Sequence, residues 1–87
     1  MYQDRQLTLA EMRSGRTGIV VGILGGPGLS RRLDALGIRP GRKVTKLSST
    51  LFRGPVILRV NNTQIAVGFG MARKIVVEVD KYLPRAS

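Results

Sequence analysis

The stretch VILRVNNTQIAV, at residues 56–67, reads as a tight β-hairpin and decides the fold class of this chain. In its first half every second residue is Val or Leu, which is the period of a strand with one apolar face. Asn61 and Asn62 follow as a turn pair, because asparagine accepts the positive φ that such turns require. Residues 64–67 then return as the second strand of the hairpin.

Three other segments are predicted to be strands. Residues 17–24 are apolar on both faces, which favours a central strand. Residues 44–48 alternate poorly, so we expect a bulge or a bend there. Residues 75–79 alternate again and form the last strand. About five short strands joined by tight turns predict a mainly β fold, either a small barrel or two packed sheets.

A short helix is expected after the first of these strands. Leu29, Leu33 and Leu36 recur at helical spacing, and Gly37 is expected to end the helix as a Schellman cap. Residues 25–28 fit neither known phosphate-loop spacing, although they are rich in glycine. We interpret them as a plain turn between strand and helix.

The N-terminal region carries the local signals of another short helix. Thr8 and Glu11 have capping-box spacing, and Leu7 and Met12 stand where a hydrophobic staple would place them. We therefore expect about one turn of helix there, packed as a lid on the rest of the fold. Residues 68–72 are predicted to interrupt the strands a second time, with one helical turn.

The chain has 87 residues and contains no Cys, His or Trp. One small domain over residues 1–87 is expected, with a core at about 7–79 and loosely held ends at 1–6 and 83–87. The usual ligands of structural zinc, iron–sulfur and haem sites are missing, and Ser-His or Cys-His nucleophile pairs cannot form. The five carboxylates show no clustered pair, so we assign no metal site and no cofactor. These absences disfavour an enzyme.

The first residues do not resemble a secretory signal, and no apolar stretch approaches the length that crosses a bilayer. We therefore expect a cytoplasmic protein that does not insert into the membrane.

The net charge of +10 is concentrated in the middle of the chain, where residues 29–59 hold eight Lys or Arg against Asp34 alone. Such a segment could follow a phosphate backbone, so a nucleic-acid-binding barrel is one hypothesis. The aromatic residues that stack bases are scarce, however, because only Tyr2, Phe52, Phe69 and Tyr82 are present. The basic residues concerned are Arg39, Arg42, Lys43, Lys46, Arg53 and Arg59.

Arg31 and Arg32 stand out within this basic segment. We expect them in the first turn of the short helix, where positive charges oppose the helix dipole, and Asp34 in its second half, where a negative charge does so too. The hypothesis that follows is that the two arginines face an acidic partner. A plain solvated face is the alternative.

The order and spacing of four motifs resemble the ferrous iron transport protein A (FeoA) family of bacterial cytosolic proteins, over about residues 7–79. The motifs are LAEM at residues 9–12 with Gly15 and Gly18, LDALGIRPG at 33–41, GPV at 54–56, and GFGMARKIVVE at 68–78. The resemblance implies an SH3-like barrel with a short helical insertion. It also implies a non-enzymatic accessory role with the membrane ferrous iron permease FeoB, by docking on its cytosolic G-protein part. Similar barrels also occur in metal-dependent repressors and nucleic-acid-binding modules, so the nucleic-acid hypothesis stays open.

We expect the docking patch to be both basic and apolar. Ordinary core packing is an equal alternative for its two phenylalanines and its methionine. Self-association through an open barrel edge is a further expectation. The residues predicted to bind the partner are Leu29, Arg31, Arg32, Phe52, Arg53, Phe69 and Met71.

Overall fold

The computed structural model describes residues 5–49 and 54–79. These residues confirm the mainly β class, with six strands where about five were expected. In chain order the elements are β1 (Gln6–Thr8), β2 (Thr17–Ile23), α1 (Pro27–Ala35), β3 (Lys43–Ser49), β4 (Val56–Val60), β5 (Thr63–Val67), α2 (Phe69–Ala72) and β6 (Ile75–Val79).

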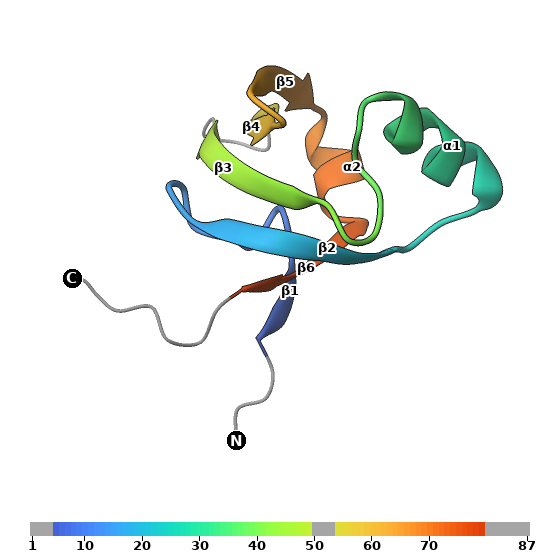
Figure 1. Ribbon diagram of the computed structural model, residues 1–87, viewed down its shortest axis with the longest axis horizontal. Helices are drawn as coiled ribbons and strands as arrows, with labels where there is room; N and C mark the ends of the chain where they lie inside the picture. Colours follow the sequence, from blue (N-terminus) through green and yellow to red (C-terminus); the bar gives the residue numbers. More distant parts are fainter. Residues whose placement is uncertain (1–4, 50–53, 80–87) are drawn as a thin grey trace.

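The six strands form one antiparallel sheet in the order β1-β6-β2-β3-β4-β5. Strand β2 lies between β6 and β3, which confirms the central position predicted for it. Figure 1 shows the sheet curling, so that β4 and β5 lie above β2 and β3, with α1 at one end of these two strands. The insertion between β2 and β3 is therefore presented at one side of the barrel.

The hairpin of β4 and β5 forms as its sequence predicts. Asn61 and Asn62 adopt φ values of 53° and 65°, and the two strands pair without a register shift. The bulge expected in β3 is also present, because the pairing of β3 with β4 shifts between Lys46 and Ser48. The single helical turn expected near residue 70 is α2.

The apolar core draws on the strands β2 to β6, both helices and the N-terminal turn. Its side chains are almost completely buried, as expected for the alternating faces of the predicted strands. The core residues are Leu9, Met12, Val20, Leu33, Ile38, Val44, Val56, Leu58, Val60, Val67, Ala72, Ile75 and Val77. Because Leu33 and Ile38 belong to this core, α1 is held to the barrel at its C-terminal end.

The C-terminus of α1 is the Schellman cap that the sequence predicts. The backbone N–H of Ile38 donates to the Leu33 carbonyl and that of Gly37 to the Asp34 carbonyl, both at 2.9 Å. Gly37 has φ +89°, a conformation that favours glycine. The helix starts earlier than expected, at Pro27 with Gly26 as N-cap, because the fixed φ of proline suits the first helical position.

The N-terminal helix prediction was wrong, although the capping box behind it forms. The Thr8 N–H donates to Glu11 Oε1 at 2.9 Å, and the Glu11 N–H donates to Thr8 Oγ1 at 3.3 Å. Leu7 and Thr8 belong to β1, which pairs with β6, so only one turn is left for the residues that follow. That turn still packs on the barrel through the buried side chains of Leu9 and Met12.

Candidate partner-binding surface

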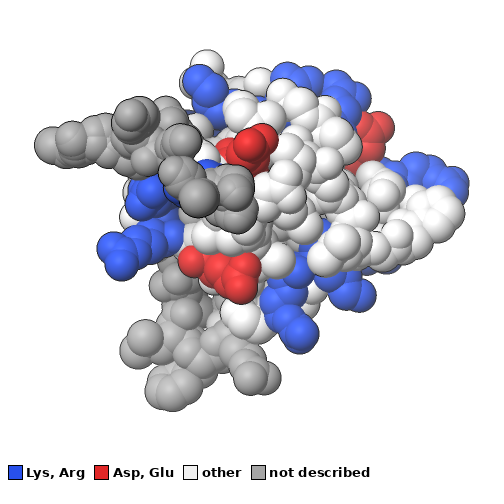
Figure 2. Space-filling model, turned by 90° about the horizontal axis from the view of Figure 1, so that it is seen from below, with Lys and Arg blue, Asp and Glu red and all other residues white. Residues whose placement is uncertain are grey.

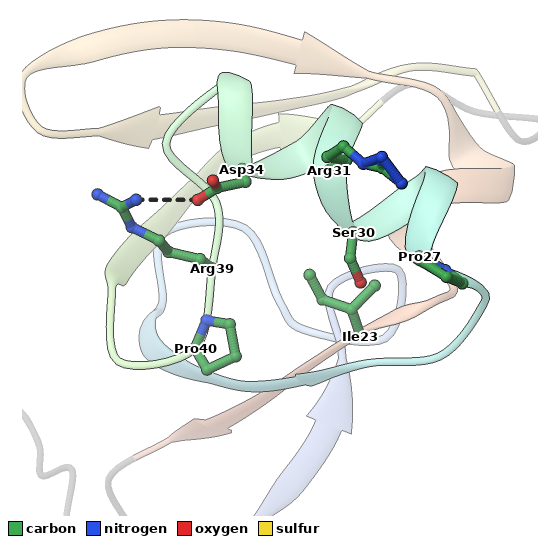
Figure 3. A pocket seen from close by; sticks show the side chains of 7 residues that line it. All are labelled: Ile23, Pro27, Ser30, Arg31, Asp34, Arg39 and Pro40. Carbon is green, nitrogen blue, oxygen red and sulfur yellow. Dashed lines mark hydrogen bonds and ion pairs between the residues drawn. The ribbon is translucent and has the colours of Figure 1, made fainter.

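A hollow of about 600 Å³ lies beside α1. Its volume falls in the range of ligand-binding clefts, which is roughly 300–1,000 Å³. In Figure 3 the Ser30 side chain points toward Ile23, and the two prolines lie at opposite sides of the view. The hollow is lined by Ile23, Pro27, Ser30, Arg31, Asp34, Arg39 and Pro40.

Three charged side chains line this hollow, and two of them form an ion pair. The Arg39 guanidinium donates to Asp34 Oδ1 at 2.9 Å, with both side chains about half exposed. Among the described residues, the Arg31 guanidinium and the Ser30 hydroxyl have no hydrogen-bonding partner. The hollow therefore carries a net charge of +1 and two polar groups that are free to bind a ligand.

The helix-dipole argument for Arg31 and Arg32 was wrong, because α1 begins at Pro27. Arg31 lies at mid-helix and Arg32 in the last turn, where a positive charge interacts favourably with the dipole. Asp34 does lie in the last turn, but Arg39 neutralises it. The charges of α1 are therefore compatible with the helix dipole without an acidic partner. The remaining evidence that Arg31 binds a partner is its position in the lining of the hollow.

A second exposed feature is an apolar strip on β2 and the residue after it, formed by Ile19, Val21 and Leu24. These side chains are 38–55% exposed. Val21 is the extra residue of a bulge, because Val20 pairs with Val77 whereas Gly22 pairs with Val76. Both faces of β2 are apolar, as the sequence indicates, and the face that carries this strip is partly open to solvent. Figure 2, which views the molecule from below Figure 1, shows an uncharged area with both basic and acidic side chains at its margins.

Lys46 is buried, with 3% of its surface exposed. Its ammonium donates to the carbonyl oxygens of Leu9 at 3.0 Å, Ala10 at 3.2 Å and Met12 at 2.6 Å. These contacts tie the N-terminal turn to the middle of β3. Lys46 is thus a structural residue and is not available to bind phosphate.

The burial of Lys46 predicts a pH dependence of stability. Desolvation lowers the pKa of its ammonium from the ordinary value of 10.5. The unfolded chain therefore keeps this proton at alkaline pH values where the folded chain releases it. Because stability rises with pH wherever the unfolded state binds more protons, the contribution of Lys46 should rise as the pH approaches 10.5.

Urea unfolding from neutral pH to 10.5 would measure this effect as the difference in free energy of unfolding between the unmodified chain and Lys46→Met. We expect that difference to increase with pH. A decrease would show that the carbonyl contacts favour the charged amine more strongly than burial disfavours it.

Several basic residues considered for nucleic-acid binding are instead buried or paired within the fold. Lys46 is buried, Arg39 pairs with Asp34, and Arg42 donates to Asn61 Oδ1 at 3.1 Å. Of the six basic residues, Arg53 lies outside the described residues, and only Lys43 and Arg59 are both exposed and without a partner in the described part of the chain. Two separate cations provide a short track for a phosphate backbone.

Within residues 5–49 and 54–79, no group of three or more His, Cys, Asp or Glu side chains could hold a metal ion. No helix in these same ranges is long and apolar enough to span a membrane.

Comparison with known proteins identifies the family. A model of the FeoA domain matches residues 7–79, which is most of the chain. The chain belongs to the FeoA family. A protein of Methanocaldococcus jannaschii, named as a candidate Fe(2+) transport protein A, is 38% identical over 74 residues, which are 85% of this chain and 88% of that protein.

Solved FeoA structures share the fold. The crystal structure of an iron uptake regulatory protein (FeoA) has a TM-score of 0.77 and 37% identity, covering 84% of this chain and 95% of its own. The FeoA of Stenotrophomonas maltophilia, complexed with zinc, has a TM-score of 0.70 and 24% identity, covering 83% of this chain and 89% of its own. That protein is described as a prokaryotic SH3 domain protein and a candidate activating factor of ferrous iron transport. The SH3-like fold predicted for this FeoA chain is confirmed.

The predicted partner-binding residues of this FeoA chain fall in different environments. Arg31 and Arg32 are exposed on α1, and only Arg31 lines the hollow. Leu29 and Met71 are half-buried and pack against the core, and Phe69 is half-buried at the start of α2. Phe52 and Arg53 lie outside the described residues.

Sequence reasoning missed two parts of the FeoA surface, the β2 strip and the apolar lining of the hollow. The strip was missed because a run of apolar residues in a central strand is usually covered on both faces. The hollow was missed because Ile23 and Pro40 come together only through the fold. The one local signal was a proline on each side of the helix. Pro27 was interpreted as part of the turn between strand and helix, and Pro40 as part of the motif at residues 33–41.

Proposed function

We propose that this chain is a cytoplasmic accessory protein of ferrous iron uptake, not an enzyme, and that it docks on the cytosolic G-protein part of the permease FeoB. Membership of the FeoA family, matched over residues 7–79, carries this proposal. The similar proteins named for iron transport support the general role.

The surface described above is suited to protein binding. The β2 strip offers exposed Ile19, Val21 and Leu24, and apolar side chains of this kind form the centre of protein interfaces. The net charge of +10 would steer the chain toward an acidic partner and raise the rate of association.

The mechanism would be stabilisation of one conformation of the permease domain. A bound protein shifts such an equilibrium only by the difference in its affinity for the two conformations. The affinity of this chain for the domain should therefore depend on the guanine nucleotide that the domain holds.

Calorimetric titration of the chain into the purified cytosolic domain of the permease, with GDP or with a non-hydrolysable GTP analogue, tests the proposal. We expect binding whose affinity differs between the two nucleotide states. Val21→Glu should weaken it about tenfold or more, because a charge would be buried in an apolar contact. Thr63→Glu, at an exposed position on β5, is the matched control. Absence of binding in both nucleotide states would overturn the proposal.

The nucleic-acid hypothesis is decided by a separate titration. A short duplex and a short single strand would be titrated at two salt concentrations while fluorescence anisotropy is followed. We expect weak binding that salt abolishes, since of the six basic residues considered for phosphate contacts only Lys43 and Arg59 are exposed and without a partner in the described part of the chain. Tight binding that persists near physiological salt would favour nucleic acid over the permease.

A further inference from the structure

The hollow beside α1 has the properties of a site for one carboxylate next to an apolar group. Ile23 and the two prolines give it an apolar lining, and Arg31 supplies a guanidinium without a partner among the described residues. In Figure 3 the Ser30 side chain lies beside Ile23, whereas the Arg31 side chain lies along another side of α1, and the Ser30 hydroxyl can donate a hydrogen bond. Both polar groups come from consecutive positions of α1, about 100° apart around the helix, so the long Arg31 side chain must turn toward Ser30 for both to reach one carboxylate.

The charges in the hollow indicate an anion with a single negative charge. Asp34 already neutralises Arg39 at 2.9 Å, which leaves the charge of Arg31 uncompensated. One carboxylate would balance that charge. A phosphate would bring about two negative charges close to the Asp34 carboxylate, which would repel it.

The residues that line the hollow also favour a peptide over a nucleic acid as its ligand. Base recognition on small barrels uses aromatic side chains on which bases stack, and the hollow has none. Proline and isoleucine surfaces instead suit an aliphatic side chain. Their combination with a single free arginine fits a short extended peptide in which Glu or Asp stands beside Leu, Ile or Val.

We propose that the hollow beside α1 binds an acidic-apolar segment of a protein partner, with Arg31 and Ser30 holding its carboxylate and Ile23 and Pro40 covering its aliphatic side chain. The identity of that partner as the permease rests on the proposed function. The proposed chemistry of the hollow does not rest on that function, because its binding of an acidic-apolar peptide can be tested with peptides alone.

The test uses the ¹⁵N-labelled chain and two capped peptides, acetyl-Leu-Glu-Leu-amide and acetyl-Leu-Gln-Leu-amide. We expect saturable shifts of the amide signals of Ser30 and Arg31 with the glutamate peptide. The glutamine peptide should bind about three- to fivefold more weakly, since an exposed charge pair contributes only modestly. Inorganic phosphate is titrated in a separate arm.

Two variants locate the site. Arg31→Gln should weaken binding of the glutamate peptide by the same three- to fivefold as removing its charge, and should leave binding of the glutamine peptide unchanged. Arg73→Gln, at an exposed arginine that follows α2 and lies outside the hollow, should leave both affinities unchanged. Arg31 has no partner in the described structure, so its replacement should not disturb the fold.

Several outcomes would overturn the proposal. Shifts that spread evenly over the basic surface, or equal effects of the Arg31 and Arg73 variants, would show only non-specific attraction by the net charge. Tighter binding of phosphate than of the glutamate peptide at Ser30 and Arg31 would identify an inorganic anion site.

The same variants distinguish this inference from the proposed function. If the permease domain binds and Arg31→Gln binds it equally well, the hollow is not the contact, although the accessory role stands. If the domain does not bind but the glutamate peptide does, the accessory role fails and the hollow serves a different acidic partner.

Discussion

Replacement of Lys46 by Met is expected to lower the free energy of unfolding by about 3 kcal/mol. Methionine keeps the length and apolar character of the lysine stem, so little packing is lost. It provides no donor, however, for the carbonyls of Leu9, Ala10 and Met12. In the described part of the chain no backbone N–H donates to these three oxygens, so they would be left without a partner.

Two opposing terms determine the size of this effect. Burial of an ammonium is unfavourable, and Lys46→Met would remove that penalty. Loss of the hydrogen bonds would leave two buried carbonyls and one partly buried carbonyl unsatisfied, at roughly 1–3 kcal/mol each. The second term is larger because three acceptors depend on one donor.

Thermal and urea unfolding followed by circular dichroism measure the difference, which should appear as a fall in Tm of roughly 15 °C. Lys43→Met is the matched control, since Lys43 is exposed on the same strand and should change stability by no more than about 0.5 kcal/mol. Equal stability of the two variants would mean that water satisfies the carbonyls and that Lys46 does not anchor the turn.

The features predicted correctly from the sequence are those fixed by residues close together in the chain. The Asn61-Asn62 turn and the Gly37 cap depend on local backbone conformations that few residue types adopt, so their positions were found to the residue. Alternation likewise located β4 and β6. In each case a few neighbouring residues are sufficient to determine the local backbone conformation.

The features missed depend on contacts between distant segments. β1 is only three residues long, and its pairing with β6 outweighs the helix signals of Thr8 and Glu11. Lys46 was grouped with the surface cations because lysine is rarely buried, and its three acceptors lie more than thirty positions away along the chain. Arg31 was singled out for its charge, but its place in the hollow depends on how α1 packs.

The packing of α1 leads to the second large effect, because Leu33→Ala is expected to lower the free energy of unfolding by about 3 kcal/mol. Leu33 is completely buried and belongs to the core that α1 shares with the barrel. Its truncation would remove apolar contacts and leave a cavity at the point that holds the insertion in place. The hollow lies beside the same helix, so the peptide affinity of the hollow should fall as well.

Leu36→Ala provides the comparison that makes this prediction specific. Periodicity alone places Leu33 and Leu36 on the same face, but α1 ends at Ala35, and Leu36 is the C-cap with 41% of its surface exposed. Its truncation should therefore change stability by less than about 1 kcal/mol. Urea unfolding of the two variants measures the difference between them. Similar losses in the free energy of unfolding would place Leu36 in the core and contradict the observed end of the helix. A large loss at Leu33 and a small one at Leu36 would show that Leu33, and not Leu36, holds the C-terminal end of α1 to the barrel.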